Sequence, residues 1–161
     1  MPYAPFHQYF PELAKRETRS VAIFERELDG LPRGQYGLLE LYCDEPGCDC
    51  RRVMFIVVTP QGRDPLAVIA YGWETRAYYA RWMGDDDPRI VRELKGPVLN
   101  LGSPQSRLAP AILDLVKNVV LADEAYVERL KTHYRLFRQE IEKRALEQRR
   151  AERKKRRKRV R

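Results

Sequence analysis

The sequence has few of the residues that disulfide frameworks and metal-dependent active sites use. Its 161 residues contain three cysteines and two histidines. All three cysteines lie between Cys43 and Cys50, so they cannot cross-link distant parts of the chain. An odd number of cysteines, clustered in this way, argues against a disulfide framework.

Several sequence signals are also missing. No run of 18 apolar residues occurs, which excludes a transmembrane helix by hydropathy. The opening residues MPYAPFHQYFPELAKRE have neither a basic start nor an unbroken apolar stretch, so we expect no secretory signal and a cytoplasmic, reducing location. There is no glycine-rich phosphate loop, HExxH motif or nucleophile elbow, and we therefore expect a non-enzymatic protein.

Positive charge is concentrated at one end of the chain. Residues 143–161 contain 12 Lys and Arg and two Glu, which gives this segment a net charge of +10. The whole chain has a net charge of +8, so residues 1–142 have a net charge of −2. Such a segment predicts sequence-independent, salt-sensitive contact with nucleic acid or a ribonucleoprotein. A solubilising extension and a membrane-surface contact are the alternatives. The densest part comprises Arg153, Lys154, Lys155, Arg156, Arg157, Lys158 and Arg159.

The first half of the chain has the pattern of short β-strands. Blocks rich in β-branched and aromatic residues are separated by turn-forming residues and by the cysteine stretch. They predict an antiparallel four-stranded meander with a cysteine-rich hairpin tip. The blocks cover residues 21–24, 36–42, 53–58 and 66–71, after an irregular or helical lead-in over residues 3–16.

After Trp73 the pattern becomes helical. Thr75, Asp87 and Asp123 are suited to cap helices, Gly84 to end the first, and Ser103 or Ser106 to begin another. Pro110 favours the later of these two starts because proline belongs in the first turn. The helix after Asp123 has an apolar stripe that needs a partner surface. The stripe consists of Val127, Leu130, Tyr134, Phe137 and Ile141.

The sequence therefore predicts an α+β fold in which packed helices and a long C-terminal helix follow the meander. Because the apolar stripe stops at Ile141, we place a zinc-binding α+β domain at residues 1–142. Residues 143–161 form a basic tail, helical or disordered.

The cysteines Cys43, Cys48 and Cys50 have the spacing C-x4-C-x-C, at the expected tip of the hairpin. A turn at Pro46-Gly47 would bring the thiolates together, and zinc is the ion that favours such sulfur ligands. Arg51 and Arg52 could offset the negative charge. Cysteines without a ligand, and redox or disulfide chemistry, are the alternatives.

The stretch does not provide an obvious fourth ligand. His133 flanks the apolar stripe and could complete the site with its imidazole, and His7 is the second candidate. Water, a carboxylate or a partner group could also fill the position. The alternative for His133 is a hydrogen-bonded histidine at the edge of the core.

The string YCDEPGCDCRRV, with AYGWE and GDDDP further on, resembles a group of small bacterial proteins that carry a cysteine-rich hairpin. The resemblance covers residues 7–142 and implies no particular activity. The CxC fragment is similar to the zinc-associated SEC-C and SWIM motifs. Those motifs place a second Cys-His or Cys-Cys pair downstream, and no such pair follows here.

Two further groups could bind ligands. Asp85, Asp86 and Asp87 could hold a divalent cation, although capping before Pro88 explains Asp87. Aromatic residues could stack on bases or line a peptide groove, but their spacing also fits packing on the sheet. These are Trp73, Tyr78, Tyr79 and Trp82. The alternative function is an interaction adaptor in which the metal hairpin and exposed aromatic residues bind another protein. A zinc hydrolase with Glu45 or Asp49 as base is the third possibility.

Overall fold

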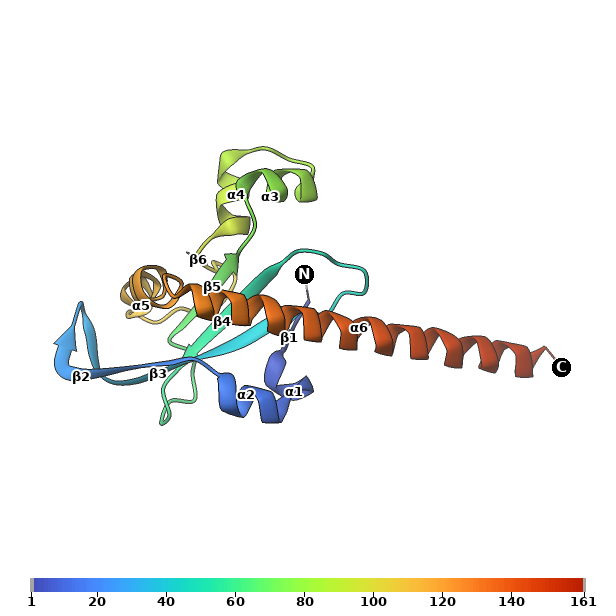
Figure 1. Ribbon diagram of the computed structural model, residues 1–161, viewed down its shortest axis with the longest axis horizontal. Helices are drawn as coiled ribbons and strands as arrows, with labels where there is room; N and C mark the ends of the chain where they lie inside the picture. Colours follow the sequence, from blue (N-terminus) through green and yellow to red (C-terminus); the bar gives the residue numbers. More distant parts are fainter. Residues whose placement is uncertain (1, 161) are drawn as a thin grey trace.

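A computed structural model describes residues 2–160 and has an α+β fold, as predicted (Figure 1). The strands are β1 (Tyr3–Pro5), β2 (Ser20–Leu28), β3 (Leu31–Cys43), β4 (Arg52–Val58), β5 (Ala67–Gly72) and β6 (Val98–Leu99). The helices are α1 (Phe6–Tyr9), α2 (Pro11–Glu17), α3 (Arg76–Met83), α4 (Pro88–Lys95), α5 (Ala109–Leu115), the π-helical η1 (Val116–Val120) and α6 (Glu124–Arg159).

The strands form one antiparallel sheet. Strands β2 to β5 pair in sequence order, which confirms the predicted meander. The sequence reading missed two strands: β1, which pairs with the end of β3, and β6, which pairs with β5. Both are too short to show the alternation by which a strand is recognised.

One face of the sheet packs against the first half of α6. Along β3 the buried residues alternate, as a strand with one buried face requires, and they include Leu38, Glu40 and Tyr42. The ring of Tyr42 lies 5.6 Å from that of Phe137, and the ring of Phe55 on β4 lies 6.4 Å from that of Tyr126. These contacts place the core between the sheet and α6.

The predicted caps of three helices are confirmed. The side chains of Thr75, Asp87 and Asp123 each accept a hydrogen bond from a backbone N–H at the start of α3, α4 and α6. Gly84, with φ of 71°, ends α3 in the left-handed conformation that glycine adopts without strain.

The helix expected from Ser103 or Ser106 begins later, at Ala109, with Pro110 in its first turn. It continues as the π-helical η1, in which the Leu121 N–H donates to the Val116 carbonyl oxygen at 2.9 Å. The apolar spacing, read at 3.6 residues per turn, did not predict this turn. In the wider turn Val116 and Val120 are buried, whereas Val119 is 49% exposed.

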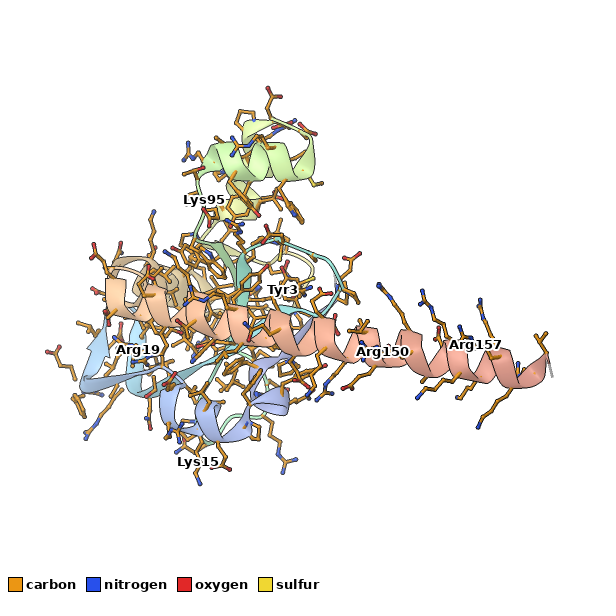
Figure 2. The ribbon with its side chains drawn as sticks, turned by 45° about the vertical axis from the view of Figure 1, so that its right-hand side comes forward. Tyr3, Lys15, Arg19, Lys95, Arg150 and Arg157 are labelled. Carbon is orange, nitrogen blue, oxygen red and sulfur yellow. The ribbon has the colours of Figure 1, made fainter. Side chains whose placement is uncertain are left out.

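Helix α6 has a buried half and an exposed half. Leu130, Tyr134, Phe137 and Ile141 of the predicted stripe are buried, whereas Val127 is partly exposed and Tyr126 is buried beside it. Beyond Ile141 no residue up to Val160 is buried, and the helix extends away from the body to Arg159 (Figures 1 and 2). The division at residue 142 stays a prediction. Within residues 2–160, no helix has the length and apolar character to cross a bilayer.

Candidate metal centre

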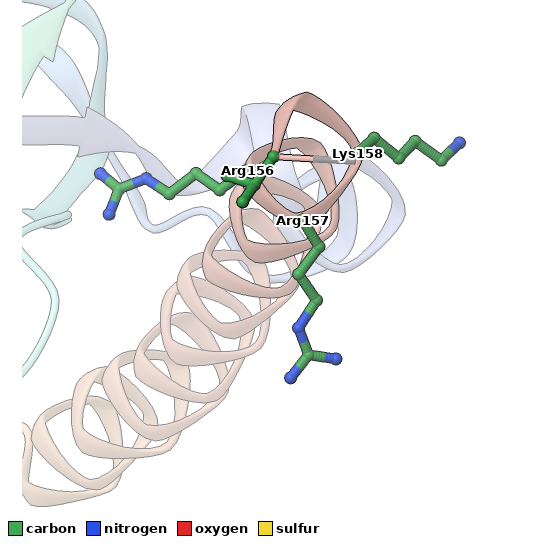
Figure 3. Close-up of a pocket in the computed structure, with 4 residues that line it drawn as sticks. Arg156, Arg157 and Lys158 are labelled. Carbon is green, nitrogen blue, oxygen red and sulfur yellow. The ribbon is translucent and has the colours of Figure 1, made fainter.

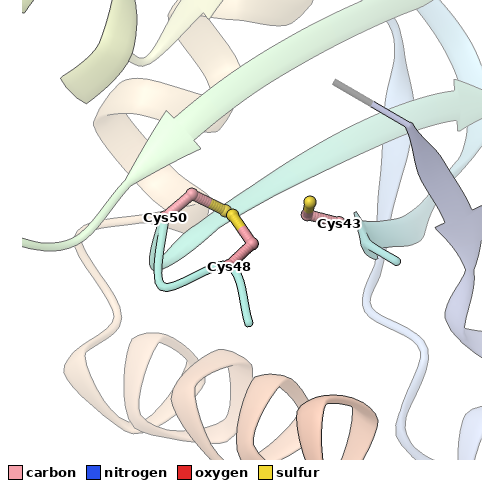
Figure 4. Close-up of side chains that lie close together, drawn as sticks. All are labelled: Cys43, Cys48 and Cys50. Atoms are coloured by element: carbon pink, nitrogen blue, oxygen red, sulfur yellow. The ribbon is translucent and has the colours of Figure 1, made fainter. Parts of the chain in front are cut away.

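The three cysteines converge, as their spacing predicted. Cys43 ends β3, and Cys48 and Cys50 approach it from the loop that leads to β4 (Figure 4). All three are free, and their sulfur atoms lie within 4.8 Å of one another. Tetrahedral zinc, with Zn–S bonds of about 2.3 Å, holds its sulfurs about 3.8 Å apart. The thiols are therefore close to the separation that one metal ion requires.

Two side chains of helix α6 form hydrogen bonds with backbone groups of Cys43 and of the loop that follows it. The Arg138 guanidinium donates to the carbonyl oxygens of Cys43 at 2.7 Å and Glu45 at 2.8 Å. The Gly47 N–H donates to the Glu142 carboxylate at 2.6 Å, and Arg138 and Glu142 are themselves paired at 2.7 Å. We call these two residues the loop clamp. The sequence analysis missed them, because a charged pair four residues apart on a helix is an ordinary surface feature.

The other end of the loop is held by tyrosine hydroxyls. Tyr79 donates to the carbonyl oxygen of Arg51 at 2.8 Å, Tyr78 donates to that of Asp49, and Tyr134 accepts from the Arg51 N–H at 3.2 Å. Arg51 has φ of 49°, in the left-handed region that residues other than glycine rarely occupy. Such a conformation persists only where its surroundings fix it. These contacts therefore fix the backbone on both sides of Cys50 and close to Cys48.

The electrostatics differ among the three thiols. The pKa of Cys43 is lowered to about 6, mainly because its sulfur accepts a hydrogen bond from the Cys50 thiol. Burial acts in the opposite direction and raises this pKa, whereas the charge of Arg138 makes a smaller contribution that lowers it. The same hydrogen bond, together with burial, raises the pKa of Cys50, and burial raises the pKa of Cys48. Since metals bind thiolates, occupation by a metal would displace the remaining thiol protons.

The side chains of the two arginines after the loop bind other groups. Arg51 pairs with Asp49 at 2.9 Å and with Glu74 at 3.1 Å. Arg52 is buried and donates to the carbonyl oxygen of Leu94 at 2.7 Å, so it binds the end of α4. The cation that acts on a cysteine is Arg138, which comes from a distant part of the sequence.

The structure does not bring His133 to the thiols. Its Nδ1 lies 2.7 Å from Glu40 and its Nε2 lies 2.6 Å from Glu17, so both ring nitrogens have carboxylate partners. The ring is 1% exposed and stacks on Phe6. The geometry supports the alternative of a hydrogen-bonded core histidine over the predicted ligand, while His7 is exposed on α1.

Glu40 is the polar residue of the core that the sequence analysis missed. Its carboxylate accepts from Tyr42 at 2.7 Å and lies beside His133. The signal was present, because Glu40 falls between Leu38 and Tyr42 on the alternating positions that face the core. An inward acidic residue predicts a buried polar partner.

The carboxylates set the charge state of His133. Burial alone would lower its pKa, but the hydrogen bonds and charges of Glu40 and Glu17 outweigh burial and raise it. The cavity beside the ring has a volume of about 10 Å³, which leaves space for no more than about one water molecule. We interpret this cluster as a structural link between α2, β3 and α6.

The predicted phosphate-contacting residues lie apart from the metal centre. Residues 153–159 form the last two turns of α6, and all of them are exposed. Figure 3 shows the side chains of Arg156, Arg157 and Lys158 leaving the helix in different directions. The arrangement offers cations to an anionic partner without any part of the body in the way.

The remaining candidates are explained by packing and capping. Asp87 caps α4, and Asp85 accepts from the Asp87 N–H at 2.9 Å. Of the residues that the structure describes, only the three cysteines form a cluster of metal-ligand type. Tyr79 is fully buried, and Trp73 packs edge-on against Tyr134. The predicted aromatic set therefore serves mainly to hold the structure together.

The cysteine site and the basic helix are thus the two features of the chain that suggest a function. The resemblance of the cysteine stretch to the bacterial hairpin proteins rests on its residues alone. Comparison of the chain with models of protein families, with curated proteins and with solved structures finds no match.

Proposed function

We propose that the chain is a zinc-binding, non-enzymatic protein whose basic helix contacts nucleic acid or a ribonucleoprotein. The observation that carries the first part is the convergence of three thiols within 4.8 Å on a loop fixed by two helices. Sulfur ligands in tetrahedral arrangement favour zinc over hard cations. Cys43, Cys48 and Cys50 supply three of the four positions.

The role proposed for the metal is structural. It would join the end of β3 to the loop before β4, and through the loop clamp it would stabilise the contact with α6. Three thiolates donate much negative charge to zinc, so the ion is a weak Lewis acid. The bases suggested for a hydrolase are poorly suited: Asp49 is paired with Arg51, and Glu45 is exposed on the loop.

The basic segment supports the second part. Residues 143–161 carry net charge +10 on a chain whose other 142 residues carry −2, and the described part of this segment projects as an exposed helix. Phosphate binding by several Lys and Arg residues releases counterions, which makes the affinity steeply dependent on salt.

The test compares the intact chain with a chain that ends after Glu142, which keeps the loop clamp. Both are purified with zinc and titrated against labelled DNA and RNA, by fluorescence anisotropy, over a range of salt concentrations. We expect equal zinc content and a loss of most nucleic-acid affinity on truncation, with log affinity of the intact chain falling by about 0.9 per contact per tenfold rise in salt. Equal affinities for the two chains would refute the role of the helix.

A second candidate, an interaction adaptor, is favoured by a different surface from the one predicted. A groove of about 750 Å³ lies beside the edge strand β6, lined by Arg52, Leu94 and Leu99 among others. Met83 and Leu101, which also line it, are 52% and 86% exposed. Recovery of a stoichiometric protein with both the intact and the truncated chain, and no nucleic acid with either, would make this candidate the leading one.

A further inference from the structure

The exposed part of α6 is a preformed helix with cations on every side. From Lys143 to Arg159 it has 17 residues, which at a rise of about 1.5 Å per residue is about 26 Å. Successive residues are separated by about 100° around the axis, so the seven consecutive basic residues 153–159 cover the whole circumference. Arg150 and Arg157 both lie on the part of the helix that extends beyond the body (Figure 2).

This distribution does not fit a membrane surface. Helices that lie on membranes have an apolar face opposite a basic one. The apolar residues here are Ala145, Leu146, Ala151 and Val160. Val160 is about 22 Å along the axis from Ala145, so the four residues form no continuous apolar face. Leu146 and Ala151, five residues apart, point about 140° away from each other.

A single strand of nucleic acid is also a poor match. Proteins that bind single strands combine a basic groove with aromatic side chains on which the bases stack. Residues 143–161 contain no aromatic residue. A helix that protrudes into solvent provides no groove.

Duplex DNA has phosphates along both edges of its major groove. An α-helix that lies in this groove can therefore contact phosphates with cations on all sides of its circumference. The major groove of B-form DNA is about 12 Å wide and admits an α-helix, whose diameter with side chains is about 10–12 Å. The major groove of A-form RNA is too narrow and deep for side chains to read. Because α6 is anchored in the core up to Ile141, its exposed half need not fold on binding.

We propose that residues 143–159 of α6 bind in the major groove of duplex DNA and contact the phosphates of both strands. The inference rests on the proposed function and specifies its partner. The basic side chains contact phosphates without reading bases, so the affinity is largely independent of sequence.

The first experiment uses the full chain with zinc and four probes at one salt concentration. These are a 20-base-pair DNA duplex, one of its strands, an RNA duplex of the same sequence and anionic phospholipid vesicles. We expect the DNA duplex to bind at least tenfold more tightly than the other three. Equal or tighter binding of the single strand, the RNA or the vesicles overturns the inference, whereas absence of binding to every nucleic acid refutes the proposed function itself.

The second experiment asks whether opposite sides of the helix both make contacts. One variant carries Arg149→Gln, Arg153→Gln and Arg156→Gln, which lie on one side; its matched control carries Lys154→Gln, Lys155→Gln and Lys158→Gln, on the opposite side. Both lose the same charge. Contact with both walls predicts similar losses of duplex affinity and a reduction of about 2.7 in the salt slope of each variant.

A loss confined to one of the two variants would show one-sided contact and overturn the inference. As an independent readout, dimethyl sulfate methylates guanine N7, an atom exposed in the major groove. We expect the bound protein to reduce this methylation in the full-length complex. Unchanged methylation on saturated duplex would exclude the major groove.

Discussion

His133 is held by carboxylates from two different elements, Glu17 on α2 and Glu40 on β3. From the sequence it was a candidate metal ligand, with a hydrogen-bonded core histidine as the alternative, since both roles require an imidazole near other polar groups. The choice depended on which acidic residues faced it across the sheet, and one of them is 93 residues away in the sequence.

We predict that the ring of His133 titrates above the ordinary histidine pKa of about 6.5, because two carboxylates stabilise its charged form. The stability that this interaction provides is then fully present below the unfolded-state pKa and is lost as the pH rises through the raised folded-state value. Glu17→Gln should lower the pKa of His133. The measurement is an NMR titration of the ring resonances.

The matched control for this titration is Glu12→Gln, which removes the same charge from an exposed position on the same helix. It should leave the titration of His133 nearly unchanged. If both variants lower the pKa equally, the general charge of α2, and not the hydrogen bond at 2.6 Å, determines the protonation of His133.

We predict that freshly reduced protein contains about one zinc ion per chain and that the double variant Cys48→Ser with Cys50→Ser contains none. Binding to the native state alone stabilises it, by about 2.7 kcal/mol when free metal is about 100 times its Kd. The variant should therefore unfold at a lower temperature, and a chelator should lower the wild-type midpoint to that of the variant. Elemental analysis that finds no metal in the wild type would disprove the prediction.

At the scale of elements, the apolar stripe of α6 shows how local pattern and tertiary packing agree. Its period of 3.6 residues was visible in the sequence, and the structure places it on the inward residues of β3 and β4. The four strands of the meander and the three capped helices were predictable for the same reason, since each is signalled by neighbouring residues.

The elements that the sequence did not predict depend on distant partners. Strand β6 consists of Val98 and Leu99, which are extended because they pair with β5, and no two-residue string predicts this. At the site, the convergence of the cysteines followed from their spacing. The loop clamp did not, because Arg138 and Glu142 lie 93 to 95 residues from the carbonyl and amide groups that they bind.

We predict that Phe137→Ala destabilises the fold by about 3–5 kcal/mol, because the ring is fully buried between Tyr9 and Tyr42 and its removal leaves a cavity. The control on the same helix is Leu146→Ala, whose side chain is 48% exposed and should change stability by less than about 0.5 kcal/mol. Urea denaturation measures both. Similar losses for the two variants would show that the core extends beyond Ile141.

At the scale of the whole molecule, a slightly acidic body is joined to a strongly basic rod by a single uninterrupted helix. Between residues 142 and 160 no side chain is buried, and the contacts of this part with the body include the Arg144 guanidinium 4.6 Å from the centroid of the Tyr9 ring. Stability and charge are thus separate properties of the chain, and each can be changed without the other.

We predict that removal of residues 143–161 changes the net charge from +8 to −2 and leaves the thermal unfolding midpoint almost unchanged. The apolar area that supports folding lies in the part that remains, and exposed charges contribute little to stability. Differential scanning calorimetry of the two zinc-loaded chains provides the measurement. A midpoint that falls by more than about 4 °C would correspond to a loss of about 1 kcal/mol and would assign the segment a structural role.

The loop clamp lies where α6 leaves the body, so the cysteine loop acts at the base of a lever arm. Arg138 and Glu142 bind the loop, and the helix continues for 17 residues, or about 26 Å, to Arg159. A tilt of about 10° at the base would move the far end by about 4–5 Å by this geometry. That displacement exceeds the rise of about 3.4 Å per base pair along the axis of a DNA duplex. A small rearrangement around three sulfur atoms would therefore move the charges at the tip by more than one base pair.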